Sequence, residues 1–454
     1  MKQAICLPDS SLPRIVVIGA GFAGINLIKQ LRNKAVEIVL LDKNNFHQFQ
    51  PLLYQVAIAG LEPDSIVTPV RKLFQRYPRL SFRMAEVIKI EPDKRRVITD
   101  IGWVAYDYLV IATGSYSNYY GLKKLESHSV GLKDIRDALN IRSWALQNLE
   151  RAVITCDRAE KDALTNFVIV GGGPAGVELA GSLAEFKKYL LHKDYPELAR
   201  EWMKIYLIEA GNNLLPAMSE QSSTYALQVL KQLDVEVMLN TPVEDYDGLR
   251  VSLASGESLF ARALVWTAGV KAGFPQGLLD VELQKGGRVK VDQYNKVKGY
   301  ERIFAIGDVA AMCGVAKYPY GHPMLAPVAI QQGRLLAKNL LALIEKGTFL
   351  RPFIYRDKGS MATIGKNRAV AEIGKIKLKG WIAWLLWSTV HLFSITGFKN
   401  RFMVGINWIM RYLTYEKANR LIIRQFALKK DGAEFSLPVD DDAQAKTKAI
   451  HEKN

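Results

Sequence analysis

The sequence predicts an α/β chain with two Rossmann-like domains followed by amphipathic C-terminal helices. Three observations predict this fold: two glycine-rich turns that each join a strand to a helix, an acidic residue at the end of the next strand in both cases, and a basic, tryptophan-rich stretch near the C-terminus. The 454 residues are enough for about three domain-sized units. An apolar fraction of 49% and a charged fraction of 23% are those of a globular protein, which excludes fibrous and disordered classes.

The first glycine-rich turn follows a β-branched strand that ends at Ile18 and precedes a helical stretch. In this GxGxxG motif, Gly19 allows the tight turn, Gly21 lets the backbone approach a pyrophosphate, and Gly24 lets helix and strand pack closely. The free N–H groups of the helix N-terminus face the phosphates. A second strand ends in Asp42, where a carboxylate accepts hydrogen bonds from a ribose. The alternative is an ordinary βα turn with coincidental glycines.

The pattern repeats about 150 residues later. A strand over residues 167–170 leads into a second turn that contains Gly171, Gly173 and Gly176, and a later strand ends in Glu209. An acid at this position favours NADH over NADPH, because it would repel a 2′-phosphate. Two such turns require two dinucleotides, and the natural pairing is a tightly held, non-covalent FAD with an exchangeable NADH.

Three further stretches fit this pairing. Residues 106–114 and 263–269 are strands that run into Thr-Gly and Ala-Gly turns, and residues 302–308 form a strand with a terminal acid. With these, residues 13–345 resemble the flavoprotein reductases with two dinucleotide-binding domains. The resemblance implies an FAD domain that is interrupted by an NAD domain, with the Gly-Asp stretch at the flavin ribityl chain.

The expected division of the chain is an FAD domain over 13–165 and 301–350, an NADH domain over 166–300, a C-terminal interface and membrane-anchoring region over 351–430, and a mobile tail over 431–454. The expected FAD contacts are Gly19, Ala20, Gly21, Phe22, Ala23, Gly24, Asp42, Lys43, Val87, Thr113, Gly114, Asp308, Ala326 and Pro327. The expected NADH contacts are Gly171, Gly173, Gly176, Glu209, Ala268 and Gly269.

The electron acceptor is not a CxxC disulfide, because Cys6, Cys156 and Cys313 lie far apart in the sequence. Neither a disulfide framework nor a metal module is expected. Separated cysteines leave open a sulfide:quinone oxidoreductase, in which Cys156 or Cys313 would act. Free cysteines are more often small buried apolar residues.

An aromatic and amide-rich run over residues 44–57 follows the first ribose acid. Its rings could equally be core residues. The run resembles the corresponding stretch of type II NADH:quinone oxidoreductases, and so do residues 174–178, 267–270, 357–365 and 397–401. This resemblance implies a single-subunit FAD enzyme that oxidises NADH, reduces a membrane quinone and pumps no protons. An NADH-sensing flavoprotein of the apoptosis-inducing-factor type remains the non-enzymatic alternative.

The same resemblance implies roles for four polar residues. Glu178 would lie near the contact between flavin and nicotinamide, although a first-turn acid also suits the helix dipole. Lys399 would lie near the flavin or the quinone, or else be one more basic residue near a membrane. Gln331 and Gln332 belong to a helix associated with the quinone, but here Ala326 is followed by Pro327, which departs from the family pattern.

The C-terminal part is expected to lie on a membrane. Residues 380–398 form a 19-residue run without Asp, Glu, Lys or Arg, and residues 402–410 form a second apolar stretch. Residues 366–430 contain thirteen basic and two acidic residues, a net charge of +11 out of +16 for the chain. Basic residues around Trp-rich apolar helices indicate an interfacial anchor on anionic lipid and not a site for nucleic acid. Core packing of the Trp run is the alternative.

The expected location is therefore peripheral, on the cytoplasmic face of the cell membrane or on the matrix face of an organelle. The family resemblance also implies a homodimer through the C-terminal region.

Overall fold

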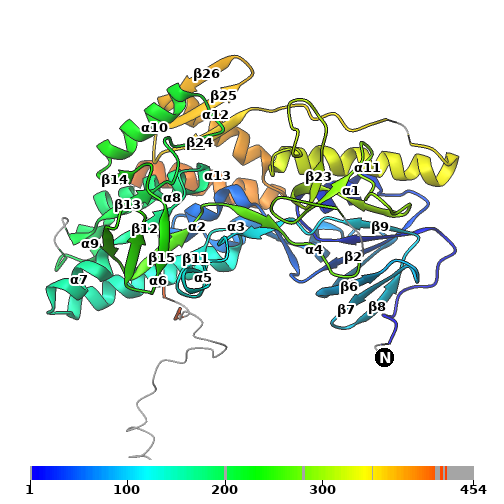
Figure 1. The fold of residues 1–454 in the computed structure, drawn as a ribbon, viewed down its shortest axis with the longest axis horizontal. Coiled ribbons are helices and arrows are strands. Elements are labelled where there is room, and N and C mark those ends of the chain that lie inside the picture. Colours follow the sequence, from blue (N-terminus) through cyan, green and yellow to red (C-terminus); the bar gives the residue numbers. More distant parts are fainter. Residues whose placement is uncertain are drawn as a thin grey trace, which may run out of the picture.

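The computed structural model describes residues 3–198, 202–278, 282–349, 351–414, 420–422 and 425–426. Two five-stranded parallel sheets form its two main domains, which lie side by side in Figure 1. The expected tail, 431–454, lies outside the described residues. The first sheet has the order β22 (Ile303–Ala305), β9 (Tyr108–Ile111), β1 (Arg14–Ile18), β2 (Glu37–Asp42), β5 (Leu80–Met84). The second has the order β11 (Val130–Gly131), β18 (Ala263–Trp266), β12 (Phe167–Val170), β13 (Ile205–Ile208), β14 (Val235–Met238).

The inner strands of both sheets are buried on both faces, as is typical of parallel sheets, whereas the edge strands β5 and β14 are only partly buried. In the central strands β1 and β12 every residue except Arg14 is apolar, and each strand leads directly into its glycine-rich turn. The helices that follow are α1 (Phe22–Gln30) and α8 (Pro174–Phe186). The predicted pair of Rossmann-like domains is confirmed.

The division between the two domains differs from the predicted boundaries. The two-residue strand β11 pairs with β18, so the chain enters the second sheet at residue 130 and not near 165. Strand β21 (Arg288–Val291) pairs with β23 (Ala310–Met312) and packs into the core of the first domain, so the return also comes earlier than residue 301. A two-residue strand has too few positions to show a period, so it could not be predicted from the hydrophobic pattern.

Two short strands, one from each main domain, join the two sheets. Strand β10 (Ser115–Ser117) continues the turn after β9, and β19 (Val270–Ala272) continues the turn after β18. These two strands pair with each other in antiparallel fashion, with Ser115 opposite Ala272. The predicted similarity between residues 106–114 and 263–269 therefore has a structural counterpart, because backbone hydrogen bonds tie the two turns together.

Short antiparallel sheets and helices complete the two domains. The sheets are β3 (Phe46–Gln48) with β4 (Val67–Pro69); β6 (Val87–Glu91), β7 (Arg96–Thr99) and β8 (Gly102–Ala105); β15 (Val243–Tyr246), β16 (Arg250–Leu253) and β17 (Ser258–Phe260); and β20 (Leu283–Gln284) beside β21. The helices are α2 (Leu53–Ala57), α3 (Pro63–Ile66), α4 (Val70–Leu73), α5 (Lys123–His128), α6 (Ile135–Ile154), α7 (Arg158–Thr165), α9 (His192–Asp194), α10 (Glu220–Gln232) and α11 (Ala326–Lys346).

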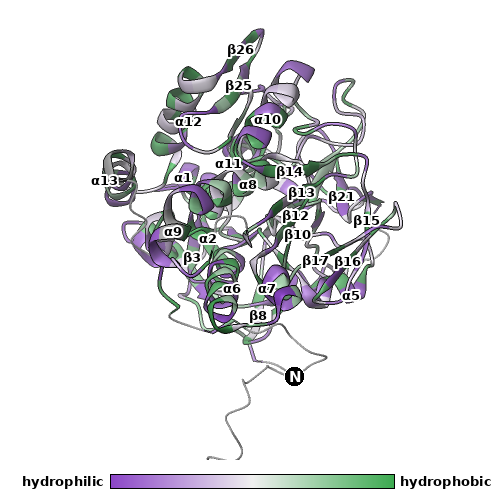
Figure 2. Cartoon of the chain, turned by 90° about the vertical axis from the view of Figure 1, so that its left-hand side faces the viewer, coloured by the Kyte–Doolittle hydropathy of each residue, from purple (hydrophilic) through white to green (hydrophobic). Residues whose placement is uncertain are grey.

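The C-terminal region adds a three-stranded antiparallel sheet and two helices. Strands β24 (Ser360–Thr363), β25 (Ala369–Ile373) and β26 (Ile376–Lys379) lead into α12 (Gly380–Ser394) and α13 (Phe398–Thr414). Figure 1 shows this sheet and α12 above the second domain, and Figure 2 shows α13 at the margin of the molecule, clear of both main sheets. The apolar run predicted over 380–398 is thus broken before α13, where Gly397 has a φ of +93°.

Helices α12 and α13 each have one buried and one exposed side. Trp387 and Val404 are buried in the core cluster that also contains α8, whereas Trp381 and Phe393 are 53% and 69% exposed. A 15-residue helix is about 22 Å long, which is shorter than the roughly 30 Å of a hydrocarbon core. Among the described residues, no helix combines the length and the apolar character that a membrane crossing needs.

Helix α11 lies against α1 at a distance that only glycine permits. A Cβ at Gly333 would collide with the carbonyl oxygen of Ala23 and lie 3.1 Å from the backbone nitrogen of Leu27. We expect Gly333→Ala to lower the free energy of unfolding by about 1 to 3 kcal/mol, because the helix carrying the first glycine turn must shift. The measurement is the apparent melting temperature of the FAD-loaded protein.

Gly405, in the middle of α13, is the matched control. A Cβ there would lie 3.7 Å from the Leu392 side chain, an ordinary contact. Gly405→Ala should leave stability unchanged or raise it by up to about 1 kcal/mol, as helix propensity predicts. Equal effects of the two substitutions would contradict the packing argument.

Candidate active site

The two glycine-rich turns have the same backbone geometry. Gly19 and Gly171 have φ values of +107° and +114°, a region that favours glycine. A Cβ at Gly19 would collide with the carbonyl oxygen of Ala112, and one at Gly171 would lie 2.7 Å from the nitrogen of Ala268. Each turn therefore needs its first glycine both for its dihedral angle and for contact with the neighbouring strand.

The other two glycines of each motif also correspond. A Cβ at Gly24 would collide with the carbonyl oxygen of Gly19, and one at Gly176 with that of Gly171, so helix and turn are in direct contact. Gly21 and the second turn's Gly173 differ from these, because a Cβ there would meet nothing within 4 Å. That open space at a helix N-terminus is the place where a pyrophosphate can approach the backbone.

The first ribose acid, Asp42, is held against the glycine turn. Its Oδ2 accepts the N–H of Ala20 at 2.7 Å, and its Oδ1 accepts the N–H of Asn44 at 2.7 Å. Burial raises the pKa of Asp42, while these two donors oppose the rise. A carboxylate has about four acceptor positions, so the two backbone bonds leave capacity for a ribose diol.

Glu209 repeats this arrangement in the second domain. Its Oε2 accepts the N–H of Gly172 at 2.5 Å, and its Oε1 accepts the N–H of Gly211 at 2.7 Å. The donors are thus the second residue of the turn and the residue two positions after the acid, as for Asp42. The sequence prediction of two equivalent turns with two equivalent acids agrees with these contacts.

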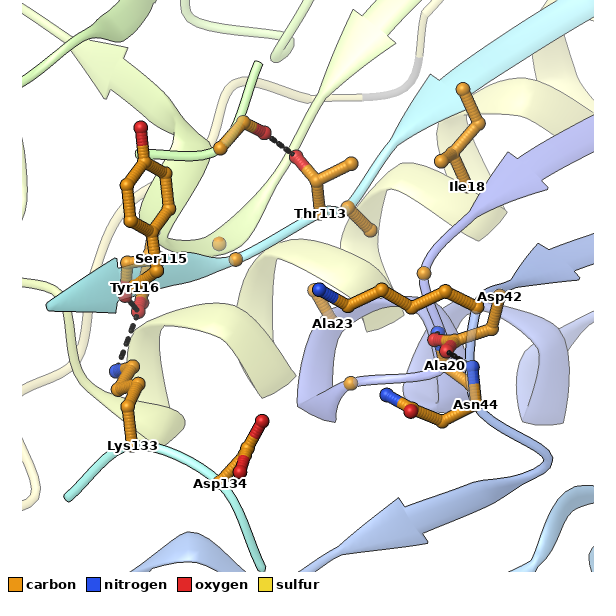
Figure 3. Close-up of a pocket in the computed structure, with 18 of the residues that line it drawn as sticks. Ile18, Ala20, Ala23, Asp42, Asn44, Thr113, Ser115, Tyr116, Lys133 and Asp134 are labelled. Atoms are coloured by element: carbon orange, nitrogen blue, oxygen red, sulfur yellow. Dashed lines mark hydrogen bonds and ion pairs between the residues drawn. The ribbon is translucent and has the colours of Figure 1, made fainter. Parts of the chain in front are cut away.

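A cavity of about 700 Å³ extends from the first turn to the loop before α11 (Figure 3). This volume lies in the range of about 300 to 1,000 Å³ that is common for ligand sites. Twelve of the predicted FAD residues line it: Gly19, Ala20, Gly21, Phe22, Ala23, Asp42, Lys43, Val87, Thr113, Gly114, Asp308 and Ala326. Gly24 packs behind the turn, and Pro327 is not among the lining residues. The glycine turn, the acid and the volume together fit FAD.

Asp308 is the centre of a network at the end of the cavity opposite Asp42. Its carboxylate accepts a short hydrogen bond from Ser115 Oγ and lies 3.6 Å from Lys133 Nζ. Its carbonyl oxygen accepts the Nε–H of the buried Arg288 at 3.1 Å. These three partners could not be predicted from the sequence, because only the folded chain brings residues 115, 133 and 288 to one place.

Arg288 also fixes the neighbouring segments of the chain. Its Nη2 donates to the carbonyl oxygens of Ala310 at 2.6 Å and His322 at 2.8 Å. Desolvation lowers the pKa of Arg288, and the negative charge of Asp308 opposes this. The guanidinium therefore joins the Asp308 turn to the loop that leads into α11.

The two glutamines of α11 bind backbone groups in this structure. Gln332 is buried, and its Oε1 accepts the N–H of Gly307 at 2.7 Å. The Gln331 side chain donates to the carbonyl oxygen of Arg356 at 2.9 Å and accepts its N–H at 3.0 Å. Gln332 therefore lies beside the turn that contains Asp308, and Gln331 holds the segment around Arg356 against α11. The assignment of both to quinone stays a prediction.

Glu178 is buried where α8 meets the C-terminal sheet. Its Oε1 accepts the N–H of Thr363 at 3.3 Å. Burial raises the pKa of Glu178 to about 8, and the Thr363 donor and the Trp387 indole oppose the rise. The indole Nε1 has no partner within hydrogen-bonding distance, so its influence is that of a nearby dipole. Burial therefore favours the protonated, neutral form of Glu178.

A second cavity, of about 110 Å³, lies next to Glu178 between the nucleotide-binding domains and the C-terminal helices. Its wall is rich in aromatic rings and includes a few polar side chains. It is lined by Tyr54, Gln55, Ile58, Ser182, Glu185, Tyr189, Thr363, Gly365, Lys366, Trp384, Trp387, Ser388, Trp408 and Tyr412. Trp408 Nε1 donates to Gln55 Oε1 at 2.9 Å, which joins α13 to α2.

The aromatic run over residues 44–57 separates the two cavities. Phe46 and His47 line the larger cavity, whereas Tyr54 and Gln55 line the smaller one. His47 Nδ1 lies 3.0 Å from the carbonyl oxygen of Ala20, so it is the donor in that bond, and burial lowers the pKa of His47 to about 4. A neutral imidazole and aromatic rings thus form the wall between the cavities.

Lys399 and the cysteines lie away from these groups. Lys399 is exposed in the first turn of α13 and lines neither cavity. Cys6 and Cys156 are exposed, and Cys313 lies near Gln284, whose Nε2 is 3.4 Å from its sulfur. None of these cysteines lines either cavity, so the structure does not favour sulfide chemistry that passes through them.

Comparison with known proteins agrees with this geometry. Residues 13–333 match the pyridine nucleotide-disulphide oxidoreductase family, and residues 358–415 match the NDH2 C-terminal domain. The type II NADH:quinone oxidoreductase NdhA of Mycobacterium tuberculosis is 33% identical over 428 residues, which cover 91% of this chain and 90% of that protein. The chain belongs to the type II NADH:quinone oxidoreductases. The family resemblance predicted from the sequence is confirmed.

Two further proteins extend the likeness. The external NADH-ubiquinone oxidoreductase 2 of Saccharomyces cerevisiae mitochondria is 27% identical over 88% of this chain and 80% of that protein. The structure of NDH2 from Plasmodium falciparum in complex with NADH superposes with a TM-score of 0.83 at 22% identity, over 91% of this chain and all of that one. The second likeness shows that the two proteins share a fold.

The buried carboxyl of Glu178 predicts a pH-dependent stability. A folded-state pKa of about 8 lies above the ordinary value of 4.5, so the unfolded chain releases this proton first as the pH rises. Between those two values, stability falls with rising pH by up to about 1.4 kcal/mol per unit. Glu178→Gln keeps a neutral group and removes this dependence.

We therefore expect the melting temperature of the wild type, minus that of Glu178→Gln, to decrease from pH 5.5 to pH 8.5. Thermal unfolding of the two proteins side by side measures it. A difference that stays constant over this range would show that Glu178 does not titrate in this way.

Proposed function

We propose that this type II enzyme oxidises NADH and passes two electrons through FAD to a membrane quinone without pumping protons. The observation that carries this proposal is the juxtaposition of two dinucleotide turns, joined by β10 and β19, with an aromatic cavity on the other side of the 44–57 wall. One dinucleotide stays bound and the other is exchanged.

The donor side favours NADH. Glu209 is fixed by two backbone N–H groups, so its negative charge cannot easily move away from an incoming ribose. A 2′-phosphate would be repelled there. Gly171, Gly173 and Gly176 would carry the pyrophosphate, and Ala268 with Gly269 would face the nicotinamide half.

The residues of the first domain would bind FAD, and Glu178 would supply a proton. FAD, when bound, accepts a hydride from NADH and gives two electrons onward. Asp42 would bind the ribose, the turn at Gly21 the pyrophosphate, and Asp308 the chain that leads to the flavin ring. Glu178, whose neutral form is favoured by burial, would be a proton source close to the second cavity, because it accepts the N–H of Thr363, which lines that cavity.

The smaller cavity is the proposed entry for the quinone ring. Six aromatic side chains line it, which suits a quinone ring, and six polar side chains, Ser182 and Gln55 among them, bring hydrogen-bonding groups to its wall. Helices α12 and α13 form its outer wall, so a lipid-dissolved substrate would reach it without crossing water. This placement differs from the one predicted for Gln331 and Gln332, whose side chains bind backbone groups.

The exposed side of α12 and α13 is the proposed membrane contact. Ile382, Phe393, Phe402 and Ile409 are each more than half exposed, and they lie on the outer sides of the two helices. Exposed lysines at 375, 377, 379 and 399 flank them and suit anionic lipid. The cytoplasmic face of a cell membrane remains the proposed location, and the homodimer stays a prediction.

The direct test is steady-state turnover of the detergent-solubilised enzyme with a short-chain quinone. We expect rapid oxidation of NADH and much slower oxidation of NADPH. Glu209→Gln should reduce the ratio of the two kcat/KM values by about tenfold or more, because the repulsive charge is lost. A flavin that NADH reduces but quinone does not reoxidise would instead indicate a sensor.

Two substitutions separate the quinone cavity from the membrane contact. Phe393→Ser should weaken binding to vesicles that contain anionic lipid, with unchanged turnover of a short-chain quinone. Ser388→Phe should fill the cavity and raise the KM for quinone severalfold, with unchanged KM for NADH and unchanged vesicle binding. Normal quinone kinetics in Ser388→Phe would place the quinone site elsewhere.

A further inference from the structure

Two lysines line the large cavity, one at each end of it. Lys43 follows the ribose acid, whereas Lys133 lies beside Asp308. Figure 3 shows Lys133 and Ser115 on one side of the pocket and Asp42 with Asn44 on the other. A dinucleotide with its ribose at Asp42 and its phosphates at the glycine turn must direct its ring system toward the Lys133 end.

Lys133 is held in place from both sides. Its backbone N–H donates to Asp137 Oδ2 at 2.8 Å, and its carbonyl oxygen accepts the side-chain amides of Gln48 at 3.3 Å and Gln50 at 3.4 Å. It precedes the N-cap of α6, where Asp134 and Asp137 form a capping box. The lysine is therefore preorganised and needs no loop closure to reach the cavity.

The charges around Lys133 are nearly balanced before any reaction occurs. Its Nζ lies 3.6 Å from the Asp308 carboxylate, and both side chains are mostly buried. Asp134 accepts the N–H of Asp137 and caps α6, and burial raises the pKa of Asp137. The N-terminus of the 20-residue helix α6 and the buried Arg288 behind Asp308 add positive potential on this side.

A hydride carries two electrons and one proton, so the ring that accepts it from NADH gains one negative charge. NAD⁺ leaves, and quinone later takes the two electrons together with that proton and a second proton from solvent. We propose that Lys133 is the residue that compensates the negative charge gained by the flavin, and that it thereby sets the potential of the bound cofactor. This inference rests on the proposed function and adds a role for a residue that the sequence did not single out.

The physical reason is preorganised electrostatics. A fixed cation in a partly buried site stabilises developing charge without the reorganisation that water would need. In the resting state Lys133 is paired with Asp308, so the pair has little net effect on a neutral ring. When the ring becomes negative, attraction to the ammonium rises, and Ser115 remains as a donor to Asp308.

The test is a reductive titration of the bound FAD with indicator dyes, without NADH or quinone. Lys133→Gln should lower the midpoint potential by about 30 mV or more, which for two electrons is a tenfold loss in relative affinity for the reduced form. Lys133→Arg should keep the potential near that of the wild type. Lys43→Gln removes the same charge at the other end of the cavity, so it should change FAD affinity more than potential.

Asp308→Asn gives a prediction of opposite sign, since it leaves the lysine uncompensated. Its midpoint potential should rise, and the double variant with Lys133→Gln should return toward the wild-type value. A purely structural role would move both single variants in the same direction. An unchanged potential in Lys133→Gln, or equal shifts in the variants of Lys43 and Lys133, overturns the inference. Because no substrate is used, this outcome is independent of whether quinone is the acceptor.

Discussion

The contact between a helical glycine and the carbonyl of the turn before it is the constraint on which this structure depends. Gly24 touches Gly19 and Gly176 touches Gly171 so closely that no Cβ fits at either place. This contact aims the free N–H groups of α1 and α8 at the open positions of the two turns. It also sets where the next strands must end, so that Asp42 and its counterpart in the second domain can bind the turns with their carboxylates.

A second close approach couples the donor domain to the C-terminal region. A Cβ at Gly181 in α8 would lie 2.8 Å from the nitrogen of Gly365, so the helix that begins at the NADH turn rests directly on the C-terminal sheet. Glu178 and Glu185, on the same side of α8, accept backbone N–H groups from Thr363 and Lys366. The Glu178 carboxyl therefore lies between the NADH-binding domain, which carries it on α8, and the aromatic cavity, which Thr363 lines.

The sequence predicted the parts of the site whose chemistry is local. A turn that needs glycine, a strand that ends in an acid and a helix that starts beside them are encoded within residues 14–42 in the first domain and 167–209 in the second. The roles of Lys133 and Arg288 could not be predicted, because each is defined by its contact with Asp308, which is more than 15 residues away in the sequence. The predicted start of the second domain came too late in the sequence, because the strand β11, with only two residues, shows no pattern. The apolar run predicted over 380–398 also extended past the end of α12, because the bend at Gly397 has no counterpart in the hydrophobic pattern. The aromatic cavity needs four helices from distant parts of the chain.

The pairing of β10 with β19 has a consequence for how such a chain can vary. Its hydrogen bonds come from the backbone, so side chains at 115–117 and 270–272 can change while the separation of the two turns stays the same. Insertion of one residue is different, because it would shift the register and turn every following side chain to the opposite face. The pairing of β10 with β19 therefore tolerates amino-acid substitutions but not insertions or deletions. A donor domain transplanted from a relative would have to carry both strands with it.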